Sequence, residues 1–251
     1  MPLRFAPLLT AAVSLFLAVS AVWASDRIIY LTFDDGPLTG TENILDVLEA
    51  EKVPAAMFMV GKHAEASAAH RALVERAKSL PHVTVGNHSY SHAHDHYRHF
   101  YADTEGVVAD MMRANEVLGL TAKPVQARLP GRDVFRLPDV YKDDLSIGRT
   151  EDEIEEIDFE FVSASGFNLY GWDHEWVHDS RGKPVQTVEH LVSEIDHLFL
   201  GGRFVRPGKL ILLMHDEMFR DNYDGNANLS ALISALRQRG YAFGSIETYD
   251  D

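Results

Sequence analysis

The sequence contains no cysteine among its 251 residues. This absence excludes a disulfide-linked scaffold, a cysteine nucleophile and any metal or iron–sulfur site that is held by thiolates. Basic residues are also scarce, since 23 Lys and Arg stand against 38 Asp and Glu, for a net charge of −15. This balance argues against nucleic acid as the partner, because binding of a phosphate backbone needs a basic patch.

Histidine and apolar residues, in contrast, are abundant. Without cysteine, any transition-metal site must be built from the 13 histidines and the carboxylates. Apolar residues make up 46% of the chain, which is enough to bury a core and excludes a disordered protein. At this length one barrel-sized domain fits as well as two small ones.

Residues 1–24 are typical of a secretory signal peptide. A single basic residue, Arg4, precedes a long apolar run that ends in small residues before Ser25. The alternative is an uncleaved membrane anchor, because residues 5–24 are just long enough to span a bilayer. We expect cleavage, which would leave residues 25–251 as one soluble, extracytoplasmic domain, periplasmic or secreted, without membrane contact.

Short apolar runs alternate with amphipathic stretches along residues 25–251. The run over 28–33 is nearly continuous, which is typical of a strand that is buried on both faces. Periodicity predicts further strands over 55–60, 83–85 and 210–214, and helices over 44–48, 63–80, 107–118, 188–199 and 229–236. This alternation predicts an α/β fold with a single distorted (β/α) barrel, closed or incomplete, of about seven parallel strands.

Residues 139–161 depart from this pattern because acidic residues dominate them, with only Lys142 and Arg149 as cations. We interpret this acidic insert as a solvated helical segment on the surface. The alternative is an acidic lid beside the functional site.

Titratable or cationic side chains follow the predicted strands. Because the carboxyl ends of parallel strands meet at one edge of the sheet, we expect these side chains to form one site. In chain order they are Asp34 and Asp35, His88 and His92, Arg128, Asp173 to Glu175, and His215.

The spacing of two histidines indicates a metal site. His88 and His92 stand four residues apart, so on a helical turn they would share a face and could bind one ion. The third ligand should be a carboxylate, for which Asp34 and Asp35 are the candidates. Two histidines and one carboxylate leave a position open for water, as in catalytic metal sites.

The remaining histidines carry weaker signals. We interpret His94, His96 and His99 as an exposed polar loop, with a second metal site as the alternative. Surface or core positions are the default for seven more, which are His63, His70, His82, His174, His178, His190 and His197.

These motifs, in this order, resemble those of the polysaccharide deacetylases of carbohydrate esterase family 4, the nodulation-factor deacetylase homology group. Residues 32–37, Thr-Phe-Asp-Asp-Gly-Pro, match the first family motif in full, and residues 88–92, His-Ser-Tyr-Ser-His, match the second. The resemblance covers about residues 27–249. It implies that a divalent metal, usually zinc, is bound by Asp35, His88 and His92, with Asp34 as general base and His215 as general acid.

The third and fourth family motifs match less well. The resemblance implies that Arg128 orients Asp34, and that a backbone N–H at Gly131, where the family has an aromatic residue, stabilises the oxyanion. In the fourth motif either Asp173 or Glu175 would hold His215 in its acid form. Trp172 and Trp176 are candidate platforms for sugar stacking, with core packing as the alternative.

Two further cations, Arg132 and Arg136, lie close to the third motif in the sequence. We expect them to be near the site, where they could receive an anionic substituent of the sugar.

The resemblance implies a metal-dependent hydrolase that removes N-acetyl groups from an N-acetylglucosamine-type polysaccharide such as peptidoglycan, chitin oligomers or an exported glycan. The alternative is an acetyl-ester hydrolase on an acetylated polysaccharide such as xylan. A glycosidase using Asp34 with Asp173 or Glu175 would leave the histidines without a role. A carbohydrate-binding module would not need both Asp34 and His215.

Overall fold

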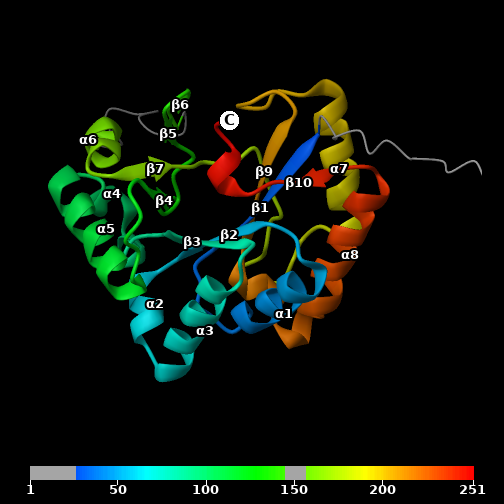
Figure 1. Ribbon diagram of the computed structural model, residues 1–251, viewed down its shortest axis with the longest axis horizontal. Coiled ribbons are helices and arrows are strands. Elements are labelled where there is room, and N and C mark those ends of the chain that lie inside the picture. The colour runs from blue at the N-terminus through cyan, green and yellow to red at the C-terminus, as the bar shows by residue number, and fades with distance from the viewer. Residues whose placement is uncertain (1–26, 145–156) are drawn as a thin grey trace, which may run out of the picture.

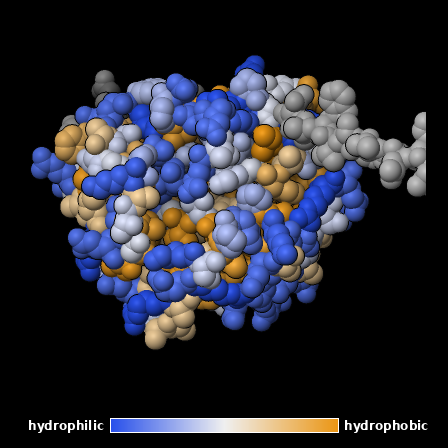
Figure 2. All heavy atoms as spheres, in the orientation of Figure 1, coloured by the Kyte–Doolittle hydropathy of each residue, from blue (hydrophilic) through white to orange (hydrophobic). Residues whose placement is uncertain are grey.

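The computed structural model describes residues 27–144 and 157–251 (Figure 1). The predicted signal segment 1–24 and the centre of the acidic insert lie outside these ranges. Within them, no helix combines the length and the apolar character needed to cross a membrane. Figure 2 shows mostly hydrophilic residues over the face that is in view, with hydrophobic atoms visible between them toward the middle.

The described strands form one curled sheet in the order β6-β5-β7-β4-β3-β2-β1-β9-β8, with β10 beside β1. The bounds are β1 Ile28–Asp34, β2 Ala55–Met59, β3 Val83–Asn87, β4 Val125–Ala127, β5 Phe135–Leu137, β6 Val140–Lys142, β7 Phe167–Leu169, β8 His174–Glu175, β9 Lys209–His215 and β10 Ala242–Phe243. Neighbours from β7 through to β8 pair in parallel, whereas β5 pairs antiparallel with both β6 and β7. The described sheet ends at β6 and β8 without closing, so the prediction of a distorted barrel of about seven parallel strands is confirmed in its incomplete form.

Eight α-helices of the described ranges accompany the sheet, and the longer ones surround its strands (Figure 1). Their bounds are α1 Thr41–Glu51, α2 Gly61–Glu65, α3 Ala68–Ser79, α4 Tyr97–Phe100, α5 Thr104–Leu118, α6 Phe159–Ala164, α7 Val188–Gly201 and α8 Gly225–Gln238. The single helix predicted over 63–80 is divided into α2 and α3. The hydroxyl of Ser67 accepts a hydrogen bond from the backbone N–H of His70, which starts the second helix as an N-cap.

The strand β1 is buried on both faces, as its apolar sequence predicts. Ile29, Leu31 and Phe33 belong to the main core, which they share with residues of α1, α7 and α8. Tyr30 belongs to a separate aromatic cluster inside the curled sheet. Because side chains alternate along a strand, Asp34 lies on the same inner face as Tyr30.

The register of the parallel strands brings their polar ends to one level. Asp34 at the end of β1 pairs directly with His215 at the end of β9. On the opposite side of β1 in the strand order, Asn87 of β3 pairs with Ala127 of β4. The next residues, His88 and Arg128, therefore leave these strands side by side. Residues distant in sequence therefore meet at one edge of the sheet.

The described part of the acidic insert differs from the helical segment that we predicted. Residues 140–142 form β6, which pairs with β5 and extends the sheet. The alternating Val140, Tyr141 and Lys142 suit a strand with one buried face. Helix α6 follows at Phe159 with Asp158 as its N-cap, and residues 145–156 lie outside the described ranges.

Candidate active site

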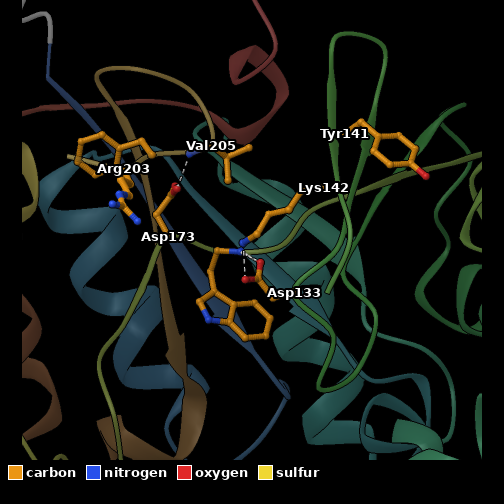
Figure 3. A pocket seen from close by; sticks show the side chains of 8 residues that line it. Asp133, Tyr141, Lys142, Asp173, Arg203 and Val205 are labelled. Atoms are coloured by element: carbon orange, nitrogen blue, oxygen red, sulfur yellow. Dashed lines mark hydrogen bonds and ion pairs between the residues drawn. The ribbon is translucent and has the colours of Figure 1, made fainter. Parts of the chain in front are cut away.

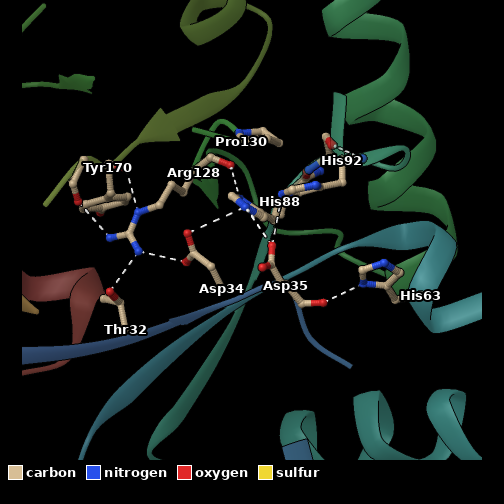
Figure 4. A network of polar contacts seen from close by, with 12 residues as sticks. Thr32, Asp34, Asp35, His63, His88, His92, Arg128, Pro130 and Tyr170 are labelled. Atoms are coloured by element: carbon tan, nitrogen blue, oxygen red, sulfur yellow. Dashed lines mark hydrogen bonds and ion pairs between the residues drawn. The ribbon is translucent and has the colours of Figure 1, made fainter. Parts of the chain in front are cut away.

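The candidate metal ligands Asp35, His88 and His92 converge beside the end of β1 (Figure 4). Asp35 Oδ1 lies 3.1 Å from His92 Nε2 and 3.5 Å from His88 Nε2. One possible ligand atom from each residue lies within 4.8 Å of the others. Asp35 has a φ of 76°, a left-handed conformation that is uncommon for a residue other than glycine and common at functional sites.

The two histidines meet through a turn, which corrects the helical spacing that we predicted for them. His88 directly follows β3, whereas His92 begins a short 3-10 segment, and both Ser89 and His92 have positive φ. Asp110 of α5 holds this turn because its Oδ1 accepts hydrogen bonds from the backbone N–H groups of Tyr90 and Ser91. The ring centroids of the two histidines are 5.3 Å apart.

The hydrogen bond of the His88 ring shows which of its nitrogen atoms is free to bind a metal together with Asp35 and His92. Its Nδ1–H donates to the carbonyl of Arg128 at 2.8 Å, which leaves the Nε2 lone pair facing Asp35. Burial lowers the pKa of His88 to about 3, so the ring is neutral near pH 7. The imidazoles of His92 and His88 outweigh burial and hold the pKa of Asp35 below its usual range. Electron pairs thus converge on one point, and the residues fit a divalent cation.

The backbone of Asp35 has a further partner that the sequence did not reveal. His63 at the start of α2 donates from Nδ1 to the Asp35 carbonyl at 2.7 Å (Figure 4). His70 donates in turn from Nδ1 to the carbonyl of His63 at 2.8 Å. His63 therefore fixes a ligand through its backbone, a role that its place in the sequence does not signal.

The expected pair of Asp34 and Arg128 is present. Arg128 Nη1 lies 2.9 Å from Asp34 Oδ1, and both side chains are buried. The guanidinium also donates to Thr32 Oγ1 and to the carbonyls of Tyr170 and Gly171, so it is fixed in place (Figure 4). Burial raises the pKa of Asp34, and the positive charge of Arg128 only partly offsets this.

His215 lines the same cleft as Asp34, Asp35 and His88. Burial lowers the pKa of His215, while the charges of Asp34 and Asp35 oppose this shift. The ring of His178 lies against it edge to face, with centroids 4.7 Å apart. His178 comes from the segment after β8, and no motif indicated that it would reach the site.

The two carboxylates of the fourth motif, Asp173 and Glu175, have different partners. Asp173 accepts hydrogen bonds from the backbone N–H groups of Val205 and Ile211, one on each oxygen, so the structure does not bring it to His215. Glu175 lines the cleft with His215, but no hydrogen bond joins the two in the described structure. Burial raises the pKa of both carboxyls.

The cleft has a volume of about 350 Å³, and two of the three candidate substrate-binding residues line it. These are Gly131 and Trp172. Trp176 is only 1% exposed, packs edge-on against Phe219 and donates from Nε1 to the carbonyl of Gln186. It is therefore a core residue in place of the stacking platform that we considered.

An aromatic ring that sequence reasoning missed lies beside Gly131. A Cβ atom at Gly131 would lie 3.1 Å from Cε1 of Tyr97, and Tyr97 also lines the cleft. Tyr97 is 6.0 Å from His92, centroid to centroid. The cleft thus has an aromatic wall next to the position where the family carries its own aromatic residue.

The residue after His215 packs under the first motif. Asp216 is fully buried and accepts a hydrogen bond from the hydroxyl of Thr41. A Cβ atom on Gly36 would lie 2.6 Å from its Oδ2, which explains why glycine follows Asp35. Burial raises the pKa of Asp216 to about 8, so the structure favours its protonated form.

Of the two cations expected near the site, Arg136 differs from that expectation, whereas Arg132 lies 5.7 Å from the ring centroid of Tyr97, which lines the cleft. Arg136 is only 5% exposed and pairs with Asp143 and Glu160, so its charge is already matched. The guanidinium of Arg132 stacks over the ring of Tyr101, with 4.4 Å to the centroid.

The remaining histidines of the loop are exposed, as predicted. His94, His96 and His99 have exposed side chains. In the ranges that the structure describes, the group of Asp35, His88 and His92 is the one set of three residues spaced to hold a metal.

Comparison with known proteins identifies the family. Residues 22–147 match the polysaccharide deacetylase family, and the chain belongs to it. The chain is 26% identical over 223 residues to YheN of Bacillus subtilis, which carries the name of this family. That match covers 88% of this chain and 68% of the relative.

Solved structures share the fold. A peptidoglycan N-acetylglucosamine deacetylase catalytic domain from Eubacterium rectale superposes with a TM-score of 0.63 at 25% identity, covering 90% of each chain. A CE4 esterase from Streptococcus mutans superposes with a TM-score of 0.64 at 23% identity, covering 88% of this chain and 86% of the other. The family resemblance, which rests on the motifs, and the barrel fold, which was predicted from the alternation of strands and helices, are therefore confirmed.

Proposed function

We propose that this protein is a metal-dependent hydrolase that removes N-acetyl groups from an N-acetylglucosamine-type polysaccharide. The observation that carries the proposal is the convergence of Asp35, His88 and His92 next to the pair of Asp34 and Arg128. The peptidoglycan N-acetylglucosamine deacetylase of Eubacterium rectale, which shares the fold, supports this class of substrate.

Asp35, His88 and His92 would hold the metal, for which zinc is our proposal. Two imidazoles and one carboxylate suit zinc and leave a coordination position open. A divalent metal bound there polarises the acetyl carbonyl and lowers the pKa of water. The hydrogen bond from His88 to the Arg128 carbonyl keeps Nε2 available as the ligand atom.

The side chains around the metal ligands supply the proton transfers. Asp34 accepts the proton of the attacking water, and its raised pKa makes it a better base. Arg128 keeps its carboxylate aimed at the cleft. The backbone N–H of Gly131 is our candidate donor to the developing oxyanion. His215 donates a proton to the leaving nitrogen, so that acetate and a free amine are the products.

The alternative reactions make different demands on these residues. A two-carboxylate glycosidase that paired Asp34 with Asp173 would need a carboxylate that is instead bonded to two backbone N–H groups. An acetyl-ester hydrolase remains the second candidate, because the CE4 esterase from Streptococcus mutans has the same fold. An alcohol leaves more easily than an amine, so His215 should matter less for an ester.

The deciding experiment incubates the purified protein with N-acetylglucosamine oligomers, peptidoglycan glycan and acetylated xylan. Mass spectrometry should show the loss of one acetyl group per deacetylated sugar with the chain length unchanged. Shortened oligomers would indicate a glycosidase, and acetate release from xylan alone would favour the ester reaction. If none of these glycans loses acetate, the proposal is wrong.

We also propose that the mature protein acts outside the cytoplasm. The basis is the signal-like segment over residues 1–24. Expression of the full chain in a bacterial host, followed by fractionation and N-terminal sequencing, tests this. A mature protein that begins near Ser25 in the periplasm or medium is the expected result, and full-length protein in the cytoplasm would contradict it.

A further inference from the structure

His215, which we assign as the general acid, has no carboxylate bonded to its ring. Among the described residues no acidic side-chain oxygen lies within 4.0 Å of its ring nitrogens, whereas His174 Nε2 lies 3.1 Å from Glu194. Asp173 is bonded to backbone N–H groups, and Figure 3 shows it beside Val205. The orientation of the His215 ring must therefore depend on other contacts.

The contact on the His215 ring comes from His178. The two imidazoles meet edge to face, with ring centroids 4.7 Å apart and ring planes at 71°. Both residues line the cleft, and His178 is half-buried there. Aromatic rings favour this arrangement, and the contact restricts the rotation of both side chains. The general acid is thus packed against a second imidazole in place of a carboxylate.

The ring of His178 is itself fixed by a hydrogen bond. Its Nδ1–H donates to the carbonyl of Asp179 at 2.8 Å. The main chain of His178 forms an antiparallel bridge with Pro184, and the N–H of Val185 donates to the carbonyl of Val177 at 2.8 Å. These contacts form a hairpin that presents His178 at the wall of the cleft.

The hairpin is closed by Asp179. Its Oδ1 accepts hydrogen bonds from the backbone N–H groups of Arg181 at 2.8 Å and Lys183 at 3.0 Å. The hydroxyl of Tyr223 donates to the carbonyl of Arg181 at 2.9 Å, which ties the hairpin to the segment after β9. Because the hairpin is bonded on both sides, it can hold the ring of His178 in one place.

We propose that His178 is a positioning residue, which holds the His215 ring in the orientation from which it protonates the leaving nitrogen. The inference rests on the proposed function, because it assigns a support to the acid of that reaction. His178 transfers no proton itself, since its Nδ1–H is bonded to Asp179 and its ring meets His215 without a hydrogen bond. Loss of the ring lets His215 turn away, which slows protonation of the leaving group and leaves glycan binding unchanged.

The kinetic test uses the intact protein with zinc and an N-acetylglucosamine tetrasaccharide. His178→Ala should lower kcat about tenfold with KM within about twofold, because a displaced acid loses part of the roughly 10²–10⁴-fold that acid–base catalysis contributes. His178→Phe keeps a ring at this position and should restore kcat to within about threefold of the wild type. His82→Ala is the matched control, since His82 is also half-buried and donates from its ring to a carbonyl, but lies before β3 and outside the cleft.

Two further comparisons separate positioning from a general structural effect. In a His215→Ala background, His178→Ala should change kcat by less than about twofold, because the ring that it supports is already absent. With 4-nitrophenyl acetate, whose leaving group needs no proton, the loss in His178→Ala should be at least about fivefold smaller than with the tetrasaccharide.

A measurement without substrate distinguishes this proposal from the deacetylase function. Neighbouring rings shift each other's proton resonances, so the NMR signals of the His215 ring, assigned by their loss in His215→Ala, should move in His178→Ala and stay in place in His82→Ala. Unmoved signals, equal losses of kcat in His178→Phe and His178→Ala, or additive losses in the double variant would overturn the proposal. Absence of acetate release from the wild type would contradict the proposed function, and the role of the contact with it, even where the NMR signals show that the contact exists.

Discussion

Asp34 at the end of β1 is buried and Asp173 directly before β8 is partly buried, and burial raises the pKa of each. Their partners differ. Asp34 faces the cleft, pairs with the fixed charge of Arg128 and lies 3.7 Å from His88. Asp173 faces two backbone N–H groups and joins the start of β8 to β9 and the segment before it. Burial therefore does not by itself identify a catalytic acid, since partners and cleft access separate the two roles.

The largest expected effect comes from the metal. Treatment with a chelator should reduce acetate release to background, and zinc should restore it, because Asp35, His88 and His92 have no other chemistry to supply. His88→Ala should match the chelated protein, whereas the exposed His94→Ala should retain wild-type activity. Full activity in a sample that elemental analysis shows to be metal-free would reject the metal site.

The next largest effects are expected from substitution of Asp34 and His215, the two residues that transfer protons. Asp34→Asn and His215→Ala should each lower kcat at least about 100-fold while the circular dichroism spectrum stays unchanged, since acid–base catalysis contributes roughly 10²–10⁴-fold. Glu189→Gln, on the exposed face of α7, is the control for loss of a carboxylate. Rates near wild type in either site variant would contradict the assigned roles.

The two fourth-motif carboxylates should respond differently to the same change. Asp173→Asn can no longer accept both backbone hydrogen bonds, so we expect a loss of about 1–3 kcal/mol in the free energy of unfolding, with kcat on a neutral oligomer within about threefold. The Glu175→Gln variant should have the free energy of unfolding of the wild type, but its kcat should be about tenfold lower, because the substitution removes a charge beside His178. Urea unfolding and initial rates measure both, and the reverse pattern would show that the two roles are exchanged.

At Asp216 the expected effect is a change in the pH dependence of stability. Its pKa of about 8 lies above that of the unfolded chain, so the folded state retains a proton that the unfolded state loses. Stability should therefore fall as the pH rises from about 4 to 8, by up to about 1.4 kcal/mol per pH unit from this group. Asp216→Asn should flatten that slope in urea titrations at several pH values. An identical slope in both proteins would show that Asp216 is ionised when folded.

The sequence predicted the long elements of the fold well, because the pattern of apolar residues is sufficient to indicate β1, β9, α5, α7 and α8. The short elements β8 and β10 have only two residues each, which is too few for any period to show. The break between α2 and α3 depends on the cap at Ser67, a local hydrogen bond that an apolar stripe does not reveal.

The site was predictable where a motif lies directly at a strand end, as for Asp34, Asp35 and Arg128. It was not predictable where a side chain reaches the cleft from elsewhere. His178 approaches from the segment after β8, and Tyr97 approaches from α4. Such contacts depend on the path of the chain in space, which spacing in the sequence does not encode.

The alternation along β1 ties catalysis to folding in a way that matters for protein engineering. Ile29, Leu31 and Phe33 lie on the helix side, and Asp34 lies on the inner side at the level of His215. A one-residue deletion within β1 would turn Asp34 outward and the apolar residues inward, so activity and stability would be lost together. Insertions and stabilising redesigns are therefore better directed at the outer faces of the helices, which do not share a backbone with the reacting groups.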